Sequence, residues 1–198
     1  MNLPNALTVT RIFLVPLLVV VLLTQFEGRN VLGLAPEIVG AAIFAVASLT
    51  DWADGYLARR RKQITPLGQV IDPLADKLLT SAALISLVQM EMASAWIVAL
   101  IIGREFAVTA LRSLAYARGV VVPASSLGKV KMVAEVVAIL ALILAHGQMR
   151  LADALYWTGQ AALWFVVVTA LVSAADYFKR FNVIVSPRVA EIRDRKAG

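Results

Sequence analysis

The stretch DWADGYLARRRKQITPLGQVIDPLAD, residues 51–76, decides how the chain is interpreted, because it places four aspartates in a mostly apolar sequence. On a helix, residues three or four positions apart share a face. The stretch therefore predicts two helix faces that each carry a pair of carboxylates. The pairs are Asp51 with Asp54, and Asp72 with Asp76. We expect these two faces to form a cage for divalent metal.

The composition outside this stretch is that of an integral membrane protein. The 198 residues are 60% hydrophobic with a mean hydropathy of +0.79, against roughly 45–50% apolar residues in soluble domains. Several apolar runs approach the ~20 residues that cross a bilayer. The runs lie at about 7–25, 38–57, 67–89, 93–115, 127–147 and 154–176. We predict an all-α polytopic protein with six transmembrane helices, forming a single domain over residues 1–198. The sixth helix is expected to end at Asp176, followed by a basic tail at about 177–198.

The basic residues predict the orientation of these spans. Of the 19 Lys and Arg residues, all but Arg29 and Arg150 lie on one side of the predicted membrane. The positive-inside rule puts that side, both termini and the four aspartates in the cytoplasm. Ionisable groups near a membrane core are costly and are usually functional. The net charge of +6 is thus assigned to the membrane surface and not to a nucleic-acid partner.

The residue types restrict the kind of metal site. The chain has no cysteine and one histidine, His146, which is predicted to lie on the opposite side from the aspartates. The metal ligands must then be oxygens, which suit magnesium, manganese or calcium. The alternative is that the aspartates pair with neighbouring arginines. Four carboxylates on adjoining faces repel one another, however, so a cation is the better explanation.

Such a site is suited to phosphoryl chemistry. Paired oxygen-ligated metals stabilise both the entering and the leaving oxygen of an in-line displacement at phosphorus. An aspartate left free by the metals can accept the proton of an attacking hydroxyl.

A second cluster on the same side is basic, which suggests two phosphate-bearing substrates, one of them a lipid. Its members are Arg104, Arg112, Lys129 and Lys131. Arg104 and Arg112 are offset by about 80° on a helix and can flank one cavity. Glu105 is expected to compensate one of the arginines, and Glu135 to pair with Lys131 four residues before it. For Arg112 and the lysines the alternative is snorkelling to lipid headgroups.

The spacing Asp51-x-x-Asp54-Gly55-x-x-Ala58-Arg59, eight residues, then Gly68-x-x-x-Asp72-x-x-x-Asp76 resembles the signature of the CDP-alcohol phosphatidyltransferase family. Four further segments resemble the bacterial members that use sn-glycerol 3-phosphate. They are NLPNALTVTR, DPLADK, GREFAVTALR and SLGKVKM. The resemblance extends from the N-terminus to about Met132.

The resemblance implies a six-helix enzyme of the bacterial inner (cytoplasmic) membrane, commonly a homodimer among membrane lipids. It would transfer the phosphatidyl group of CDP-diacylglycerol to the 1-hydroxyl of sn-glycerol 3-phosphate, with release of CMP. By the family pattern, Asp51, Asp54 and Asp72 hold two magnesium or manganese ions. Asp76 lies near the metals and acts as the catalytic base.

The resemblance also implies which residues bind the two substrates. For CDP-diacylglycerol they are Asn5, Thr8, Arg11, Asp54, Gly55, Ala58, Arg59 and Gly68. For the acceptor phosphate they are Arg104, Arg112, Lys129 and Lys131. Asn5, Thr8 and Arg11 have an alternative role as a helix cap with a snorkelling arginine.

Two other functions are compatible with parts of the pattern. A sister enzyme would use another acceptor, such as inositol phosphate, serine or phosphatidylglycerol, although a basic cluster favours a phosphorylated alcohol over serine. A cation transporter would also contain acidic groups in a helix bundle. It should place them near the midplane with access from both faces, whereas all four aspartates are predicted at the cytoplasmic end.

Overall fold

The described part of the chain is helical. A computed structural model describes the backbone of residues 3–24, 33–61, 66–117, 126–147 and 150–197, and the side chains within 10–24, 33–50, 75–113, 130–147 and 150–174. These residues contain six helices and no strand, which confirms the predicted all-α class. The helices are α1 (Leu3–Leu23), α2 (Pro36–Arg61), α3 (Pro66–Gln89), α4 (Ala95–Ala117), α5 (Ser126–Ala145) and α6 (Ala152–Ala197).

The helix bounds agree with the predicted apolar runs except at the end of α2, where residues 59–61, expected in a basic connection, are helical, and at the C-terminus. Residues 51–61 continue α2, and α3 runs through Pro73 to Gln89. The expected end of the sixth helix at Asp176 is wrong, because α6 continues for 46 residues, or ~69 Å at 1.5 Å per residue. Its second half is polar, so the apolar run ends well before the helix does.

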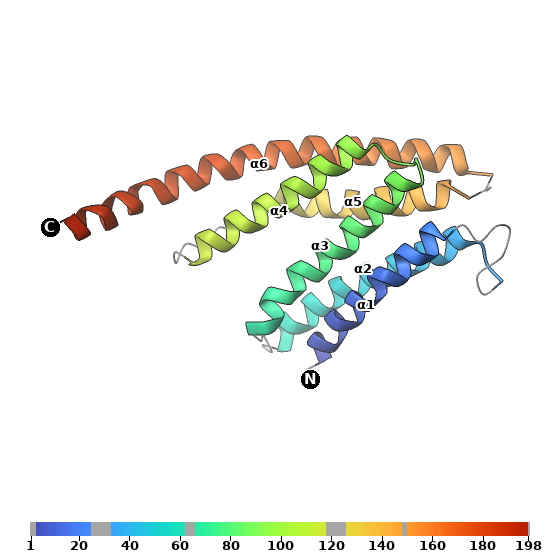
Figure 1. The fold of residues 1–198 in the computed structure, drawn as a ribbon, viewed down its shortest axis with the longest axis horizontal. Coiled ribbons are helices and arrows are strands. Elements are labelled where there is room, and N and C mark those ends of the chain that lie inside the picture. The colour runs from blue at the N-terminus through green and yellow to red at the C-terminus, as the bar shows by residue number, and fades with distance from the viewer. Residues whose placement is uncertain (1–2, 25–32, 62–65, 118–125, 148–149, 198) are drawn as a thin grey trace.

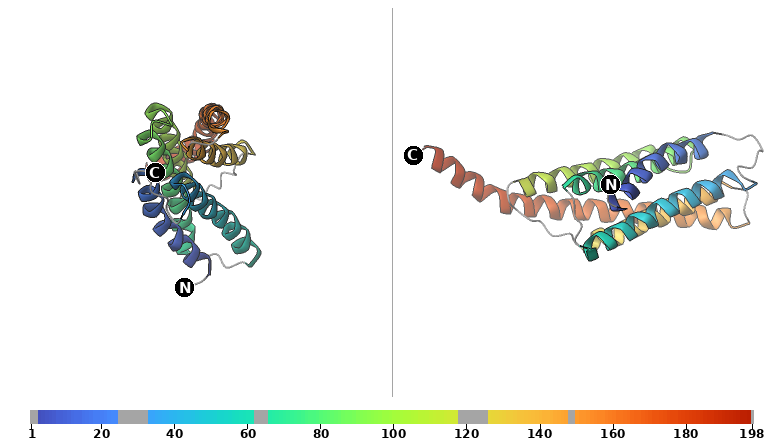
Figure 2. Two further views of the ribbon diagram at one scale, coloured as in Figure 1. Left: turned by 90° about the vertical axis from the view of Figure 1, so that its right-hand side faces the viewer. Right: turned by 90° about the horizontal axis from the view of Figure 1, so that it is seen from below.

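Successive helices run in alternating directions along one long axis (Figure 1). The end of α2, the start of α3, the end of α4 and the start of α1 therefore lie toward the same end of the helix bundle. Helices α1, α2 and α3 pack together, and α6 packs on α4 and α5. Contacts of α2 with α5, and of α3 with α4 and α5, join the two groups. The last part of α6 projects beyond the other helices (Figure 2).

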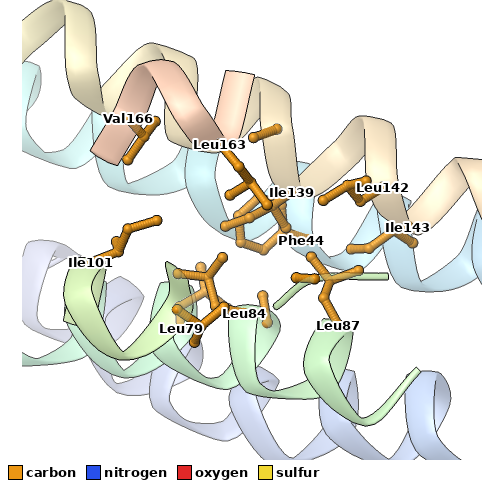
Figure 3. Packing of buried hydrophobic residues seen from close by; sticks show 14 of the residues in the cluster. Phe44, Leu79, Leu84, Leu87, Ile101, Ile139, Leu142, Ile143, Leu163 and Val166 are labelled. Atoms are coloured by element: carbon orange, nitrogen blue, oxygen red, sulfur yellow. The ribbon is translucent and has the colours of Figure 1, made fainter. Parts of the chain in front are cut away.

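Large apolar side chains from all six helices form the centre of the bundle, part of which is shown in Figure 3. Phe44 of α2 and Leu84 of α3 are fully buried and point toward Ile139 of α5 and Leu163 of α6. Ile101 of α4 closes one side of the same cluster. Each fully buried side chain of this size contributes about 1.5–3 kcal/mol relative to exposure in water. This core fixes the relative positions of the helices that carry the polar residues described below.

A glycine allows α5 and α6 to approach closely. A Cβ atom added to Gly159 would lie 2.6 Å from Cγ of Leu142 and 3.3 Å from the carbonyl oxygen of Ala138. The first distance is shorter than real Cβ contacts, so Leu142 or the helices must shift, and the second is tight against the α5 backbone. The absent side chain thus sets the spacing of this helix pair.

The turn from α3 to α4 is closed by backbone hydrogen bonds. The amide of Met92 donates to the carbonyl of Leu87 at 2.9 Å, and the amide of Glu91 donates to Val88 at 3.0 Å. This is a Schellman pattern, which requires a left-handed residue at its centre. Glu91 takes that position with φ of 60°. The side chain of Gln160 on α6 donates to the carbonyl of Met92 and holds the turn in place.

One segment of the described residues, Ala152–Ala174 of α6, is long and apolar enough by composition to cross a membrane. Thr10–Leu23 and Pro36–Thr50 are shorter apolar segments. Large apolar side chains are nevertheless exposed on every helix. Examples are Phe13, Leu49, Ile85, Leu100, Val133 and Val168.

Candidate active site

The two aspartate pairs lie on neighbouring antiparallel helices, α2 and α3 (Figure 1). Asp51 lies ten residues before the end of α2, and Asp76 lies ten residues after the start of α3. Both are thus ~15 Å from the connection along their helices. Asp54 and Asp72 are seven and six residues from the same ends. The backbone therefore places the two pairs at matching levels, as the sequence spacing predicts.

Asp76 is the signature aspartate whose side chain is described. It is half-buried, and its backbone carbonyl accepts a hydrogen bond from Thr80 Oγ1 at 3.2 Å. The side chains of Asp51, Asp54 and Asp72 lie outside the described part, as do those of Ala58 and Arg59, together with Gly55 and Gly68. Within the described side chains, no group of three potential metal ligands gathers. The shared metal cage thus remains a prediction.

Arg11 is the one proposed CDP-diacylglycerol ligand with a described side chain, since those of Asn5 and Thr8 lie outside that part. Only 2% of Arg11 is exposed. A guanidinium cannot be deprotonated in a protein, so its burial requires polar partners. Arg11 is therefore held within the bundle and does not snorkel to a surface.

A polar cluster centred on Glu105 joins α3, α4 and α5. Lys131 Nζ donates to Glu105 Oε1 at 2.6 Å, and Lys77 Nζ donates to Oε2 at 2.9 Å. Arg104 Nη1 also donates to Oε1. Lys131 makes a second bond, to Glu135 Oε2 at 2.8 Å, which confirms the predicted pair. Three cations and two carboxylates leave the cluster with one formal positive charge.

Arg104 extends this cluster to α6. Its Nη2 group donates to Ser173 Oγ, and Ser173 itself is buried. The Nε atom of Arg104 is buried without a hydrogen-bond partner among the described residues. A buried N–H group without a partner can donate a hydrogen bond to an acceptor atom of a ligand.

The structure therefore brings together two of the four residues that were predicted to bind the acceptor phosphate. Arg104 and Lys131 meet at Glu105, and Glu105 compensates Arg104 as expected. Arg112 is exposed and lies eight residues away, ~12 Å along α4. The side chain of Lys129 lies outside the described part. Sequence reasoning missed Lys77, whose bond to Glu105 spans 28 positions and leaves no local spacing to detect.

Comparison with known proteins identifies the family. A profile of the CDP-alcohol phosphatidyltransferase family matches residues 1–172. The chain belongs to the CDP-alcohol phosphatidyltransferase family. A relative from Bacillus subtilis (strain 168), named CDP-diacylglycerol–glycerol-3-phosphate 3-phosphatidyltransferase, is 44% identical over 184 residues, covering 90% of this chain and 94% of its own.

Two further relatives of this family have related names. One from Rickettsia felis, with the same name as the Bacillus protein, is 35% identical over 180 residues, covering 90% of this chain and 94% of its own. A probable phosphatidylglycerophosphate synthase from Mycobacterium tuberculosis (strain H37Rv) is 37% identical over 179 residues, covering 90% of this chain and 81% of its own.

Family membership agrees with the chemistry of the acidic stretch. The family consists of membrane-associated enzymes that generally use divalent metal ions. The donor set on α2 and α3 fits such ions, because it consists of carboxylate oxygens without thiols or imidazoles. Its backbone positions at matching helix levels fit as well.

Proposed function

We propose that the protein transfers the phosphatidyl group of CDP-diacylglycerol to sn-glycerol 3-phosphate, giving phosphatidylglycerophosphate and CMP. The observation that carries this proposal is the 44% identity to the Bacillus subtilis enzyme of that name over 90% of the chain. The proposal is supported by the aspartates on α2 and α3 and by the Glu105 cluster, which would supply the two kinds of site that the reaction needs.

The reaction is a displacement at the phosphorus that bears the diacylglycerol. The glycerol 1-hydroxyl oxygen forms a new bond to this phosphorus, and the bond to the oxygen that bridges it to CMP breaks. CMP leaves with that oxygen and its electron pair. Asp76 accepts the hydroxyl proton, a role that suits a half-buried carboxylate on the signature face of α3.

The remaining aspartates hold the metal. Asp51, Asp54 and Asp72, with Asp76 close by, would bind two magnesium or manganese ions. Bound divalent ions neutralise charge on the phosphates and polarise the phosphorus for attack. Gly55, Ala58 and Gly68 leave room for the CDP group beside the carboxylates, and Arg59 together with Asn5, Thr8 and Arg11 contacts its phosphates.

The acceptor phosphate binds on the side of the Glu105 cluster. Arg104 and Lys131 retain N–H groups beyond those that they donate to Glu105, Glu135 and Ser173. Arg112 and Lys129 would bind the same phosphate from the cytoplasmic side. The formal positive charge of the cluster favours a phosphorylated alcohol over serine.

We assign the protein to the bacterial inner membrane, as a six-span homodimer with its active site and both termini in the cytoplasm. Exposed apolar side chains on every helix support several spans, because a water-soluble bundle rarely exposes such large apolar areas. The asymmetry of Lys and Arg supports the orientation. The dimer rests on the family resemblance.

The function is tested by offering purified protein, in mixed micelles with CDP-diacylglycerol and magnesium, a panel of acceptors. The panel contains sn-glycerol 3-phosphate, inositol phosphate, serine and phosphatidylglycerol. We expect CMP release with sn-glycerol 3-phosphate. Release with serine alone would assign the protein to a sister activity. Cation flux in vesicles without CMP release from any acceptor would indicate a transporter.

A further inference from the structure

Among the carboxylates whose side chains the structure describes, Glu105 holds the largest number of cations. Its two oxygens accept hydrogen bonds from Lys77, Arg104 and Lys131, which come from three different chain segments. Without this carboxylate, three cations would face one another at the junction of α3, α4 and α5. Burial of unpaired like charges is strongly unfavourable. The position of each cation thus depends on Glu105.

The cluster is also enclosed. The exposed fractions are 4% for Lys131, 12% for Lys77 and 14% for Arg104, against 21% for Glu105. Side chains so enclosed keep fixed rotamers, and Arg104 is further held by Ser173 on α6. The N–H groups left over are therefore aimed in fixed directions. An ammonium has three N–H donors, and among the described side chains Lys131 uses two of them on carboxylates and Lys77 uses one.

Lys77 links this cluster to the proposed catalytic residue. It follows Asp76 directly on α3, and its bond to Glu105 ties that turn of α3 to α4. This ion pair thus helps to set the distance between Asp76 and the basic group.

We propose that Glu105 is a positioning residue for the acceptor: it holds Lys77, Arg104 and Lys131 as one preorganised phosphate-binding group at a set distance from Asp76. Lys77 becomes a phosphate-binding residue in addition to Arg104 and Lys131. This proposal rests on the proposed function, since it presupposes an acceptor that carries a phosphate. Glu105 itself touches neither substrate.

The test compares steady-state kinetics of Glu105→Gln and the unmodified protein, varying each substrate in turn. An amide is uncharged and has an N–H₂ group in place of one carboxylate oxygen, so either Lys77 or Lys131 loses its acceptor on residue 105. We expect the KM for sn-glycerol 3-phosphate to rise at least about tenfold, with the KM for CDP-diacylglycerol within about twofold. Inhibition by inorganic phosphate, which competes for the same group, should weaken in parallel. Glu105→Asp, which keeps the charge, should restore part of the affinity.

Glu91→Gln is the matched control, because Glu91 is exposed in the α3–α4 turn at the other end of the bundle. Its kinetics should be unchanged. If Glu105→Gln does not fold, Ser173→Ala serves instead, since it removes one bond to Arg104 and leaves no charge unpaired. It should raise the acceptor KM about threefold.

A loss of thermal stability with an unchanged acceptor KM would overturn the proposal, as would equal increases in both KM values. Failure of the proposed function is distinguishable, because the unmodified protein would then release no CMP with sn-glycerol 3-phosphate.

Discussion

Asp76 and Lys77 are consecutive on α3 and are assigned to different parts of the reaction. Asp76 is half-buried at the level of the signature aspartates, while Lys77 turns to Glu105 on α4. Adjacent helix positions point about 100° apart. In the proposed mechanism, one turn of α3 would thus present a base toward the attacking hydroxyl and a cation toward the acceptor phosphate.

We expect Asp76→Asn to lower the rate of CMP release about 10²–10⁴-fold, the range by which a positioned general base accelerates proton transfer. The measurement is the initial rate with saturating sn-glycerol 3-phosphate. Asp153→Asn is the control, since Asp153 is exposed in the first turn of α6. A variant at Asp76 that kept more than half of the rate would remove this residue from the chemistry.

Glu91 provides a test of backbone strain. A non-glycine residue at φ of 60° costs roughly 1–2 kcal/mol of stability. Glycine relieves this strain, but it also raises the conformational entropy of the unfolded chain, which offsets part of the gain. Glu91→Gly should therefore raise the stability by up to about 1 kcal/mol, seen as an apparent Tm higher by about 2–4 °C in detergent. Glu91→Ala, which keeps a Cβ atom, should give no such gain. A lower Tm for Glu91→Gly than for Glu91→Ala would refute this explanation.

Local spacing predicts some side-chain contacts and misses others for a physical reason. The Lys131–Glu135 pair follows from the four-residue repeat of a helix and is present. The Lys77–Glu105 pair depends on how α3 packs against α4, which the sequence spacing does not contain. The left-handed Glu91 was missed as well, because glycine or asparagine normally marks such a position.

Among the elements, α1 to α5 were predicted closely because their apolar runs and their helices nearly coincide. In α6 they do not. The hydropathy pattern predicts where the apolar part of a helix ends. The helix itself continues through its backbone hydrogen bonds to Ala197. The helical state of residues 51–57 and 67–76, which carry most of the signature, agrees with the predicted runs, whereas residues 59–61, expected in a basic connection, continue α2.

The contact of α5 with α6 can be tested at Gly159. We expect Gly159→Ala to cost about 1–3 kcal/mol, because the new methyl group overlaps Leu142 and forces the helices apart. The apparent Tm should fall by several degrees. Gly103→Ala in α4 is the matched control, since nothing lies within 4 Å of its added Cβ. That change should be neutral or stabilising by about 0.5–1 kcal/mol. Equal Tm values for the two variants would contradict the packing explanation.

For the whole molecule, the alternating helices place the α2–α3 and α4–α5 ends together, opposite the α3–α4 turn (Figure 1). The chain has no cysteine, so single cysteines report sidedness without background. Ser94→Cys in the turn and Ser113→Cys near the end of α4 are both at exposed positions. A membrane-impermeant maleimide should label Ser94→Cys in spheroplasts and Ser113→Cys only after permeabilisation. The reverse pattern would invert the proposed orientation.

The central claim is the transfer of a phosphatidyl group to sn-glycerol 3-phosphate, and the lipid product tests it most directly. Purified protein is incubated with CDP-diacylglycerol, magnesium and carbon-13-labelled sn-glycerol 3-phosphate, and the extracted lipids are analysed by mass spectrometry. We expect a lipid that contains two phosphates and the intact labelled glycerol, formed in equal amount to CMP. CMP release without a labelled two-phosphate lipid would contradict the claim.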